Sequence, residues 1–331
     1  MGNHKENINP KVTFNDVAFN TSGISLAKPS DFFALMKPRV MSLVVFTAWA
    51  GLVLAPGSMP LWNAFASILC IAAGAGASGA LNMWYDADID AEMSRTKKRP
   101  LPQGKMRPRA ALGFGVFVSL ASVWMLYIAS NFVASALLAF TIFFYLVIYT
   151  VWLKRRTPQN IVIGGAAGAF PPMIGWAAVT GDISFNSVIL FLLIFIWTPP
   201  HFWALALYKT IDYAKVGIPM MPNVKGPVST RNQIMLYSLA LFAIATVPLF
   251  SGLAGDLYAI CSIPLNLGFV TLAFKVWRSQ AGGIPDKKSE ASLYAVKVGD
   301  RAARNLFAYS IVYLFAIFGV LAAEALLVQA G

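Results

Sequence analysis

Three carboxylates and one amide lie close together where a long apolar segment ends, in the stretch Asn82-Met-Trp-Tyr-Asp86-Ala-Asp-Ile-Asp90. Side chains four residues apart share one face of a helix, so Asn82, Asp86 and Asp90 are predicted to form an oxygen-rich stripe. Asp88 would point elsewhere. Such a stripe suits Mg²⁺, which typically binds one or two carboxylates together with substrate phosphates. The alternative, that the acids only end the helix and pair with loop cations, stays open on spacing alone.

A second acid site follows a later apolar segment, in Tyr208-Lys-Thr-Ile-Asp212-Tyr-Ala-Lys215. Both preceding segments are predicted to run in the same direction, so the two acid sites should meet at one membrane surface. Between them in sequence lies the basic loop Arg95-Thr-Lys-Lys98-Arg99-Pro-Leu-Pro-Gln-Gly104. Two acid clusters for Mg²⁺ and cations for a phosphorylated group together indicate a diphosphate site. For most of the basic residues taken singly, topology and lipid head-group contact are the simpler explanation.

His201 is the only histidine within the apolar segments. An ionisable side chain at membrane depth is a functional candidate, and neutral imidazole is a common heme ligand. The competing interpretation is a histidine satisfied by carbonyls that Pro199 and Pro200 free from the helix ladder. If the helix continues past the prolines, His201, Tyr208 and Asp212 lie on the same helical face, because they are seven and eleven residues apart. A porphyrin bound at His201 would then lie beneath a diphosphate bound near Asp212.

The elements that must position these residues are membrane helices. Apolar residues make up 58% of the chain and charged residues 12%, whereas a soluble domain carries roughly 25% charged residues. Several runs reach the roughly 17–25 apolar residues that cross a bilayer. The sequence therefore predicts an all-α integral membrane protein with nine transmembrane helices. The predicted spans are Val40–Pro56, Leu61–Asn82, Ala110–Ala129, Phe132–Trp152, Ile161–Thr180, Ser187–Tyr208, Ile234–Gly252, Leu257–Phe274 and Leu306–Val328.

The net charge of +12 follows this topology. All 26 Lys and Arg residues fall in the N-terminal tail or in four loops on the same predicted side. The positive-inside rule then places the N-terminus in the cytoplasm and the C-terminus outside, and no nucleic-acid partner is needed to explain the charge. Residues 1–36 are predicted to be a polar, mostly flexible cytoplasmic tail with a short helix at Pro29–Met36. This tail lacks the features of a cleavable signal or an Arg-rich transit peptide, so a bacterial plasma membrane fits best. Residues 37–331 form one membrane domain.

The acid stripe, the Arg-Pro-Leu-Pro-x-Gly loop and the second acid site resemble the UbiA superfamily of intramembrane prenyltransferases. Four further stretches resemble one family within it, the heme O synthases. They are Met36-Lys-Pro-Arg-Val40, the glycine-rich segment from Asn160 to Trp176, Trp197-Thr-Pro-Pro-His-Phe-Trp203, and the segment from Asp212 to Pro222. The likeness covers roughly residues 30–328 and implies a helical bundle around a central cavity. Tyr208 stands where the superfamily often has Asp.

The resemblance also implies a reaction. Farnesyl diphosphate ionises to an allylic cation, the vinyl group of heme B attacks it, and water captures the new cation to give heme O. Asp86, Asp90 and Asp212 would hold Mg²⁺. The resemblance also implies that the protein lies in a lipid bilayer and that a downstream heme A synthase uses its product. The implied substrate contacts are Asn82, Arg95, Lys98, Arg99, Tyr208, Lys215, Asn160 and His201. Asn160 could instead only cap the following helix.

Three alternatives fit the sequence less well. A related enzyme acting on a quinone or chlorophyll precursor would not call for an intramembrane histidine. A transporter usually places charged residues near the membrane midplane, whereas these acids cluster at one face. The run Gly74-Ala-Gly76-Ala-Ser-Gly79 matches a dinucleotide motif, but it lies inside an apolar helix and follows no strand, so helix packing explains it better.

Overall fold

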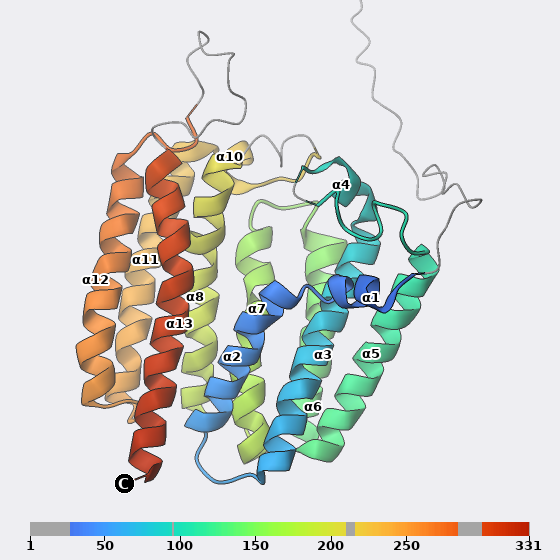
Figure 1. Ribbon diagram of the computed structural model, residues 1–331. Coiled ribbons are helices and arrows are strands. Elements are labelled where there is room, and N and C mark those ends of the chain that lie inside the picture. Colours follow the sequence, from blue (N-terminus) through green and yellow to red (C-terminus); the bar gives the residue numbers. More distant parts are fainter. Residues whose placement is uncertain (1–26, 95, 210–215, 284–299, 331) are drawn as a thin grey trace, which may run out of the picture.

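The protein is a bundle of long helices that run side by side (Figure 1). The computed structural model describes residues 27–94, 96–209, 216–283 and 300–330, and within these ranges every regular element is a helix, which confirms the predicted class. The long helices are α2 (Pro38–Leu54), α3 (Leu61–Tyr85), α5 (Pro108–Ala129), α6 (Phe132–Phe143) with its π-helical continuation η2 (Phe144–Leu153), α7 (Asn160–Thr180), α8 (Phe185–Tyr208), α11 (Gly226–Phe250), α12 (Asp256–Arg278) and α13 (Asp300–Ala330). The short ones are α1 (Pro29–Leu35), α4 (Ala87–Glu92) and α10 (Met221–Val224).

Eight of the described helices are long and apolar enough to cross a membrane, with α6 and η2 counted together. A ninth is added if α1 and α2, which are bent by 63° relative to each other, count as one span. Large apolar side chains such as Trp62, Phe117, Trp124 and Phe250 are exposed on the outside of the bundle. Because a lipid bilayer accepts such a surface without cost, the chain is a multi-pass membrane protein.

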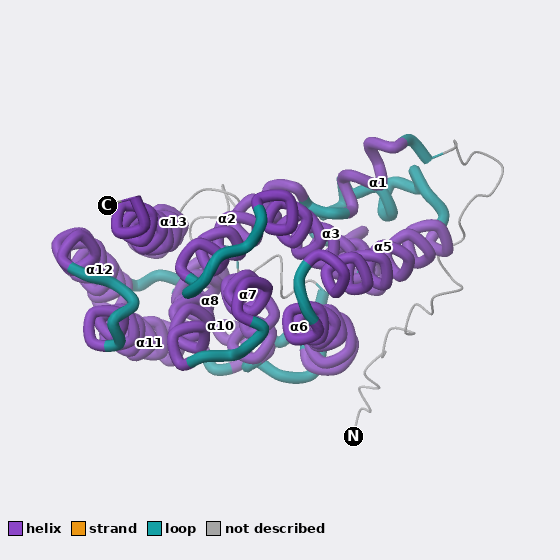
Figure 2. The backbone as a smooth tube through the Cα atoms, turned by 90° about the horizontal axis from the view of Figure 1, so that it is seen from below, coloured by secondary structure: helices purple, strands orange, loops and turns teal. Residues whose placement is uncertain are grey.

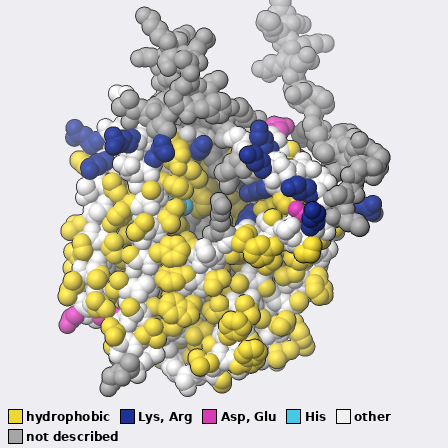
Figure 3. Space-filling model, viewed as in Figure 1, with side chains coloured by type: hydrophobic (Ala, Val, Ile, Leu, Met, Phe, Trp, Pro, Cys, Tyr) yellow, Lys and Arg dark blue, Asp and Glu magenta, His cyan; other side chains and the backbone are white. Residues whose placement is uncertain are grey.

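Seen along the helices, α11, α12 and α13 form one end of the bundle and α5 the other, with α2, α7 and α8 between them (Figure 2). The short helices α4 and α10 lie at one end of the long helices, and α13 finishes at the opposite end (Figure 1). On the face shown in Figure 3, Lys and Arg side chains gather at the end that carries α4 and α10 and around a hollow below it. The basic side chains on this face thus lie at one end of the bundle, as expected from the placing of Lys and Arg in loops on one side of the membrane.

Helices α2 and α7 approach each other closely through two glycines. A Cβ on Gly51 would lie 2.0 Å from the carbonyl oxygen of Pro172, and one on Gly175 would lie 2.0 Å from that of Ala48. Small residues let backbones meet in this way, and close packing replaces the hydrophobic drive that lipid cannot supply. Both positions therefore require glycine.

The predicted short N-terminal helix is present as α1 and packs against α3 and α5. Its last residue, Leu35, is fully buried in a cluster that includes Met83 and Leu101. The chain then turns into α2 at Lys37, whose φ of 54° is the only positive value at a non-glycine residue of the described chain. This turn brings Lys37 to the end of α3 that carries the acid stripe.

Candidate active site

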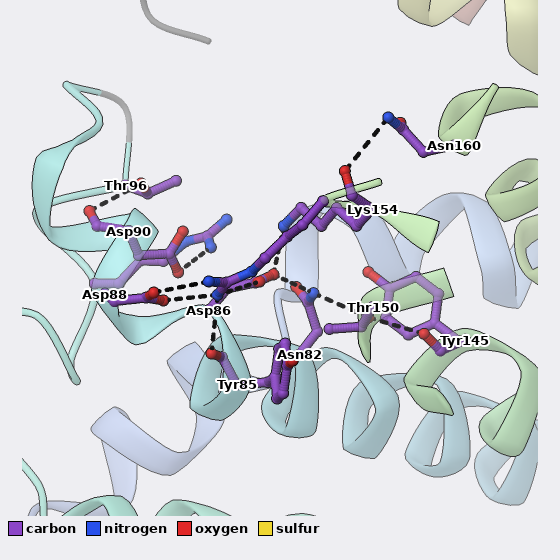
Figure 4. A network of polar contacts seen from close by, with 12 residues as sticks. Asn82, Tyr85, Asp86, Asp88, Asp90, Thr96, Tyr145, Thr150, Lys154 and Asn160 are labelled. Atoms are coloured by element: carbon purple, nitrogen blue, oxygen red, sulfur yellow. Dashed lines mark hydrogen bonds and ion pairs between the residues drawn. The ribbon is translucent and has the colours of Figure 1, made fainter. Parts of the chain in front are cut away.

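The acid stripe lies where α3 meets α4 (Figure 4). The Asp86 N–H donates to the Asn82 carbonyl at 2.9 Å and the Asp90 N–H to the Asp86 carbonyl at 2.8 Å, so four-residue hydrogen bonding spans the junction. Asp86 itself, with φ −93° and ψ 15°, separates the two helices. The Asn82 amide donates to Asp86 Oδ2 at 2.7 Å. All three side chains are buried, with Asp86 at 0% exposure. Buried carboxylates require compensating charge.

Cations from two other segments supply that charge. Lys154, which follows η2, contacts Asp86 Oδ2, and Arg99 in the loop after α4 contacts Asp90 Oδ2. A guanidinium nitrogen of Arg155 lies 3.6 Å from Asp86 Oδ1. The alternative that the acids pair with loop cations is therefore realised in this structure. It does not exclude metal binding, because cations can exchange a carboxylate for a phosphate.

Asp88 binds Arg155, whose guanidinium also reaches Asp86. Two guanidinium nitrogens of Arg155 lie 2.9 and 2.8 Å from the two Asp88 oxygens, and the same group lies 5.2 Å from the centroid of the Tyr85 ring. Burial is the largest single influence on the pKa of Asp88 and would raise it, but the hydrogen bonds from Arg155 and from the backbone, together with the charge of Arg155, hold that pKa below its usual range. This bidentate pair ties α4 to the loop between η2 and α7.

The π-helical turn of η2 directs two side chains at the stripe. The Lys154 N–H donates to the Tyr149 carbonyl at 2.8 Å, and the Thr150 hydroxyl donates to the Tyr145 carbonyl at 2.8 Å, both five residues back. The Asn82 amide in turn donates to Thr150 Oγ1 at 3.2 Å. Most π-helical segments are single turns inside α-helices and occur frequently at functional sites, whereas η2 is ten residues long. Here the wider turn places Lys154 and Thr150 beside the acids.

Lys37 also contacts the stripe. Its ammonium donates to Asn82 Oδ1 at 2.8 Å. Burial lowers the pKa of Lys37 to about 7, and the positive charges of Arg99 and Lys154 act in the same direction. Asp90 and Asp86 only partly offset this effect. Lys37 therefore changes charge near neutral pH.

Sequence reasoning did not propose Lys37, Lys154 or Arg155 as site residues. It counted them toward topology, and Lys37 also fell in a stretch that resembles the heme O synthases. Lys98, which it did propose, is exposed. Arg95, Asp212 and Lys215 lie outside the described residues. Helix α8 ends at Tyr208, and the predicted place of Asp212 beyond it also lies outside the described residues.

Two further predicted residues lie near the same end of the bundle. Asn160 is the first residue of α7 rather than its cap, and its amide donates to the carbonyls of Thr157 at 2.6 Å and Pro219 at 3.3 Å. The capping interpretation is therefore wrong, and Asn160 instead ties the loop before α7 to the segment before α10. Tyr208 packs edge-on against Phe307, with ring centroids 6.2 Å apart.

His201 lies in α8, which stays helical through Pro199 and Pro200. Its Nδ1 lies 2.6 Å from the hydroxyl oxygen of Ser310 on α13. The interpretation that carbonyls freed by the prolines satisfy this histidine is therefore wrong. A hydroxyl on a neighbouring helix satisfies it instead.

The described donors fit a hard divalent cation. Asp86 Oδ1 is fully buried without a hydrogen bond, and Asp90 and Asn82 offer further oxygen atoms beside it. Within the described ranges, no group of three or more acidic, histidine or cysteine side chains is placed to hold a metal. Two carboxylates and an amide oxygen match the sparse protein ligation of Mg²⁺, which takes its remaining ligands from phosphates and water.

This arrangement, with buried acids and at least three surrounding cations at one end of a membrane bundle, suits a diphosphate group, and comparison with known proteins agrees. The UbiA prenyltransferase family matches residues 43–288. The chain therefore belongs to this family of membrane-embedded transferases.

Curated relatives specify the branch of the family. The protoheme IX farnesyltransferase of Parvibaculum lavamentivorans is 58% identical to this chain, over 94% of this chain and 92% of the relative. That of Agrobacterium fabrum is also 58% identical, over 92% of each chain. Within its family the chain belongs with the protoheme IX farnesyltransferases.

Solved structures share the fold. A digeranylgeranylglyceryl phosphate synthase superposes with a TM-score of 0.71 at 14% identity, covering 89% of this chain and 98% of that one. A UbiA homologue of Archaeoglobus fulgidus, solved with GPP and Mg²⁺ bound, gives a TM-score of 0.60 at 15% identity, covering 88% and 99%.

Proposed function

We propose that this protein transfers the farnesyl group of farnesyl diphosphate to a vinyl group of heme B, with addition of water, to give heme O and diphosphate. The observation that carries the proposal is 58% identity, over more than nine tenths of the chain, to protoheme IX farnesyltransferases. The buried mixed-charge site supplies groups suited to the chemistry. The reaction consumes one farnesyl diphosphate, one heme B and one water.

The chemistry needs a stabilised leaving group and no enzymatic nucleophile. The bond between the farnesyl C1 and its oxygen breaks, and the electron pair leaves with the diphosphate. The vinyl π electrons form the new carbon–carbon bond, water adds to the resulting cation, and a proton is released. Lys154, Arg99 and Lys37 would bind the phosphate oxygens and stabilise the charge that develops on them.

Mg²⁺, when bound, would neutralise the leaving diphosphate. Asp86 and Asp90 would hold it, with Asp212 proposed as a further ligand. The remaining proposed diphosphate or substrate contacts are Asn82, Arg95, Lys98, Tyr208, Lys215 and Asn160. His201, deeper in the bundle, is proposed to contact the heme.

We assign the protein to the plasma membrane of a bacterium, with the basic end in the cytoplasm and heme A synthase as the enzyme that consumes its product. The Lys and Arg side chains at the end that carries α4 and α10 support this orientation, because positive loops stay inside. A reporter that works only outside the membrane should be active when fused at Gly331. A reporter signal from the cytoplasmic side would reverse the orientation.

The test is product formation in membranes that contain the protein, supplied with heme B, farnesyl diphosphate and Mg²⁺. Mass spectrometry should detect heme O, and membranes that lack the protein should give none. Replacing heme B by an aromatic quinone precursor should give no prenylated product. Prenylation of the quinone precursor without heme O would support the related enzyme class and contradict the proposal.

A further inference from the structure

A short polar connection joins α8 and α13 inside the membrane bundle. His201 Nδ1 lies 2.6 Å from Ser310 Oγ, and Ser310 Oγ lies 2.6 Å from the Phe307 carbonyl oxygen of its own helix. The Trp197 indole N–H donates to the Ser310 carbonyl at 2.8 Å. Ser310 is fully buried. Its backbone and its hydroxyl are thus both held in place, so the partner of His201 is fixed.

Aromatic side chains also fix the plane of the imidazole. The Trp197 ring stacks on it at 4.3 Å and 20°, and the Phe307 ring stacks at 4.7 Å and 26°. Phe202 meets its edge at 4.9 Å and 83°. A ring sandwiched in this way cannot exchange its two nitrogens by rotation without displacing its neighbours.

The hydrogen-bond geometry determines which ring nitrogen carries the proton. A serine hydroxyl has one hydrogen, and the 2.6 Å approach to the Phe307 carbonyl requires that hydrogen to lie between the two oxygens. The hydroxyl must then accept a hydrogen bond from His201, so Nδ1 is protonated. A neutral imidazole has a single N–H, which leaves Nε2 with a free lone pair.

Nε2 is also the nitrogen that a ligand can reach. Nε2 has no hydrogen-bond partner within the described part of the chain, and it is not fully buried. The imidazole therefore presents an accessible lone pair from an otherwise enclosed ring. A lone pair of this kind binds iron or accepts a hydrogen bond.

We propose that Ser310 is a positioning residue for the heme substrate, because it holds His201 as the Nδ1–H tautomer and so presents Nε2 to the heme iron. This inference rests on the proposed function. Histidines that bind metals almost always donate their other N–H to a fixed partner, which sets the tautomer and raises the basicity of the ligating nitrogen. Ser310 supplies that partner here.

The tautomer can be measured without any substrate. In a His4→Gln variant, His201 is the only histidine of the chain, so ¹⁵N spectra of the heme-free protein at pH 8 report on it alone. We expect a protonated Nδ1 and an unprotonated Nε2. A protonated Nε2 would overturn the proposal, and this result does not depend on whether heme is the true acceptor.

Heme binding tests the consequence. Ser310→Ala should weaken heme affinity roughly 10–100-fold, as is typical when the partner of a ligating histidine is lost, and should shift the heme absorption band toward that of His201→Ala. Affinity for farnesyl diphosphate should not change. Ser310→Thr, which keeps a hydroxyl, should restore the heme affinity and the spectrum.

Ser238→Ala is the matched control, because Ser238 is a buried serine whose hydroxyl bonds only to a carbonyl of its own helix, α11, at 2.6 Å. This variant should bind heme as the wild type does. Equal heme affinity in Ser310→Ala and wild type would overturn the role of Ser310. Failure of the wild type to bind heme would instead contradict the proposed function, while the tautomer result would stand.

Discussion

Replacing Asp86 by Asn should nearly abolish heme O formation while the protein still accumulates in membranes. The Asp86 carboxylate has 0% exposure and contacts Lys154 and Asn82, and its Oδ1 is left without a hydrogen bond. Asn keeps the shape but removes the charge and one oxygen ligand. Metal stabilisation of a leaving group is worth several kcal/mol. A loss of about 4 kcal/mol corresponds to a rate reduction of about 10³-fold.

Asp88→Asn is the matched control for this experiment. It removes the same charge two residues away, so long-range electrostatic effects are alike in both variants. The Asp88 side chain is 37% exposed and pairs with Arg155, whereas the Asp86 side chain is buried. Surface pairs contribute only about 0–1 kcal/mol, so the rate should fall less than about tenfold.

The assay is heme O by mass spectrometry, divided by the amount of folded protein in the membrane. Adding a strong Mg²⁺ chelator to the wild type should match the Asp86→Asn result. If Asp86→Asn keeps more than a tenth of the wild-type rate, or if Asp88→Asn falls equally far, the assignment of the metal to the stripe is wrong.

Three further variants test other parts of the structure. Folding lowers the pKa of Lys37 to about 7, whereas the unfolded chain keeps the proton to about 10.5, so the wild type should gain up to about 1.4 kcal/mol of stability per pH unit above pH 7. Lys37→Met lacks this gain and should therefore lose stability relative to the wild type as the pH rises. Melting curves across pH 6–9 should show this difference, and exposed Lys98→Met should not. Gly51→Ala should destabilise the fold by about 3 kcal/mol, the upper end of the usual cost of overpacking, because its Cβ would meet the α7 backbone. A Cβ on Gly113 meets nothing within 4 Å, so Gly113→Ala should melt near the wild type. Glu324→Gln should lower the melting temperature but leave activity per folded molecule unchanged. The Glu324 carboxylate accepts hydrogen bonds from three N–H groups at the start of α12, and losing a charged hydrogen bond costs about 1.5–3 kcal/mol. A melting temperature equal to that of the wild type would contradict this capping role.

Local patterns in the sequence were enough to predict the helices and the acid stripe. The predicted span Leu61–Asn82 corresponds to α3 at Leu61–Tyr85, and Phe132–Trp152 corresponds to α6 with η2 at Phe132–Leu153. Apolar length decides such elements, because a membrane helix must satisfy its own backbone. The stripe was equally predictable, since the i, i+4 relation depends only on helix geometry.

The cations of the site were not predictable, because they come from distant parts of the chain. Lys37 lies 45 residues from Asn82, and Lys154 lies 68 residues from Asp86. Nothing in their spacing separates them from the lysines and arginines that only set topology. The π-helical turn of η2 was also hidden, because a span that is apolar on all sides carries no periodicity that could reveal a change from four-residue to five-residue hydrogen bonding. The Ser310 contact of His201 depends on how α8 and α13 pack and has no local signal.

The site combines charges of both signs in a way that bears on its ligand. Two buried carboxylates beside a bilayer would be strongly unfavourable alone, and so would Lys154 and Arg99 without them. Each set therefore stabilises the other. A purely anionic ligand would draw the cations away and strand the carboxylates, and a metal ion alone would strand the cations. A diphosphate that arrives with a divalent cation avoids both penalties, because its oxygens accept the cations while the metal takes the carboxylates. The mutual pairing of acids and bases thus favours the joint binding of metal and diphosphate over either one separately.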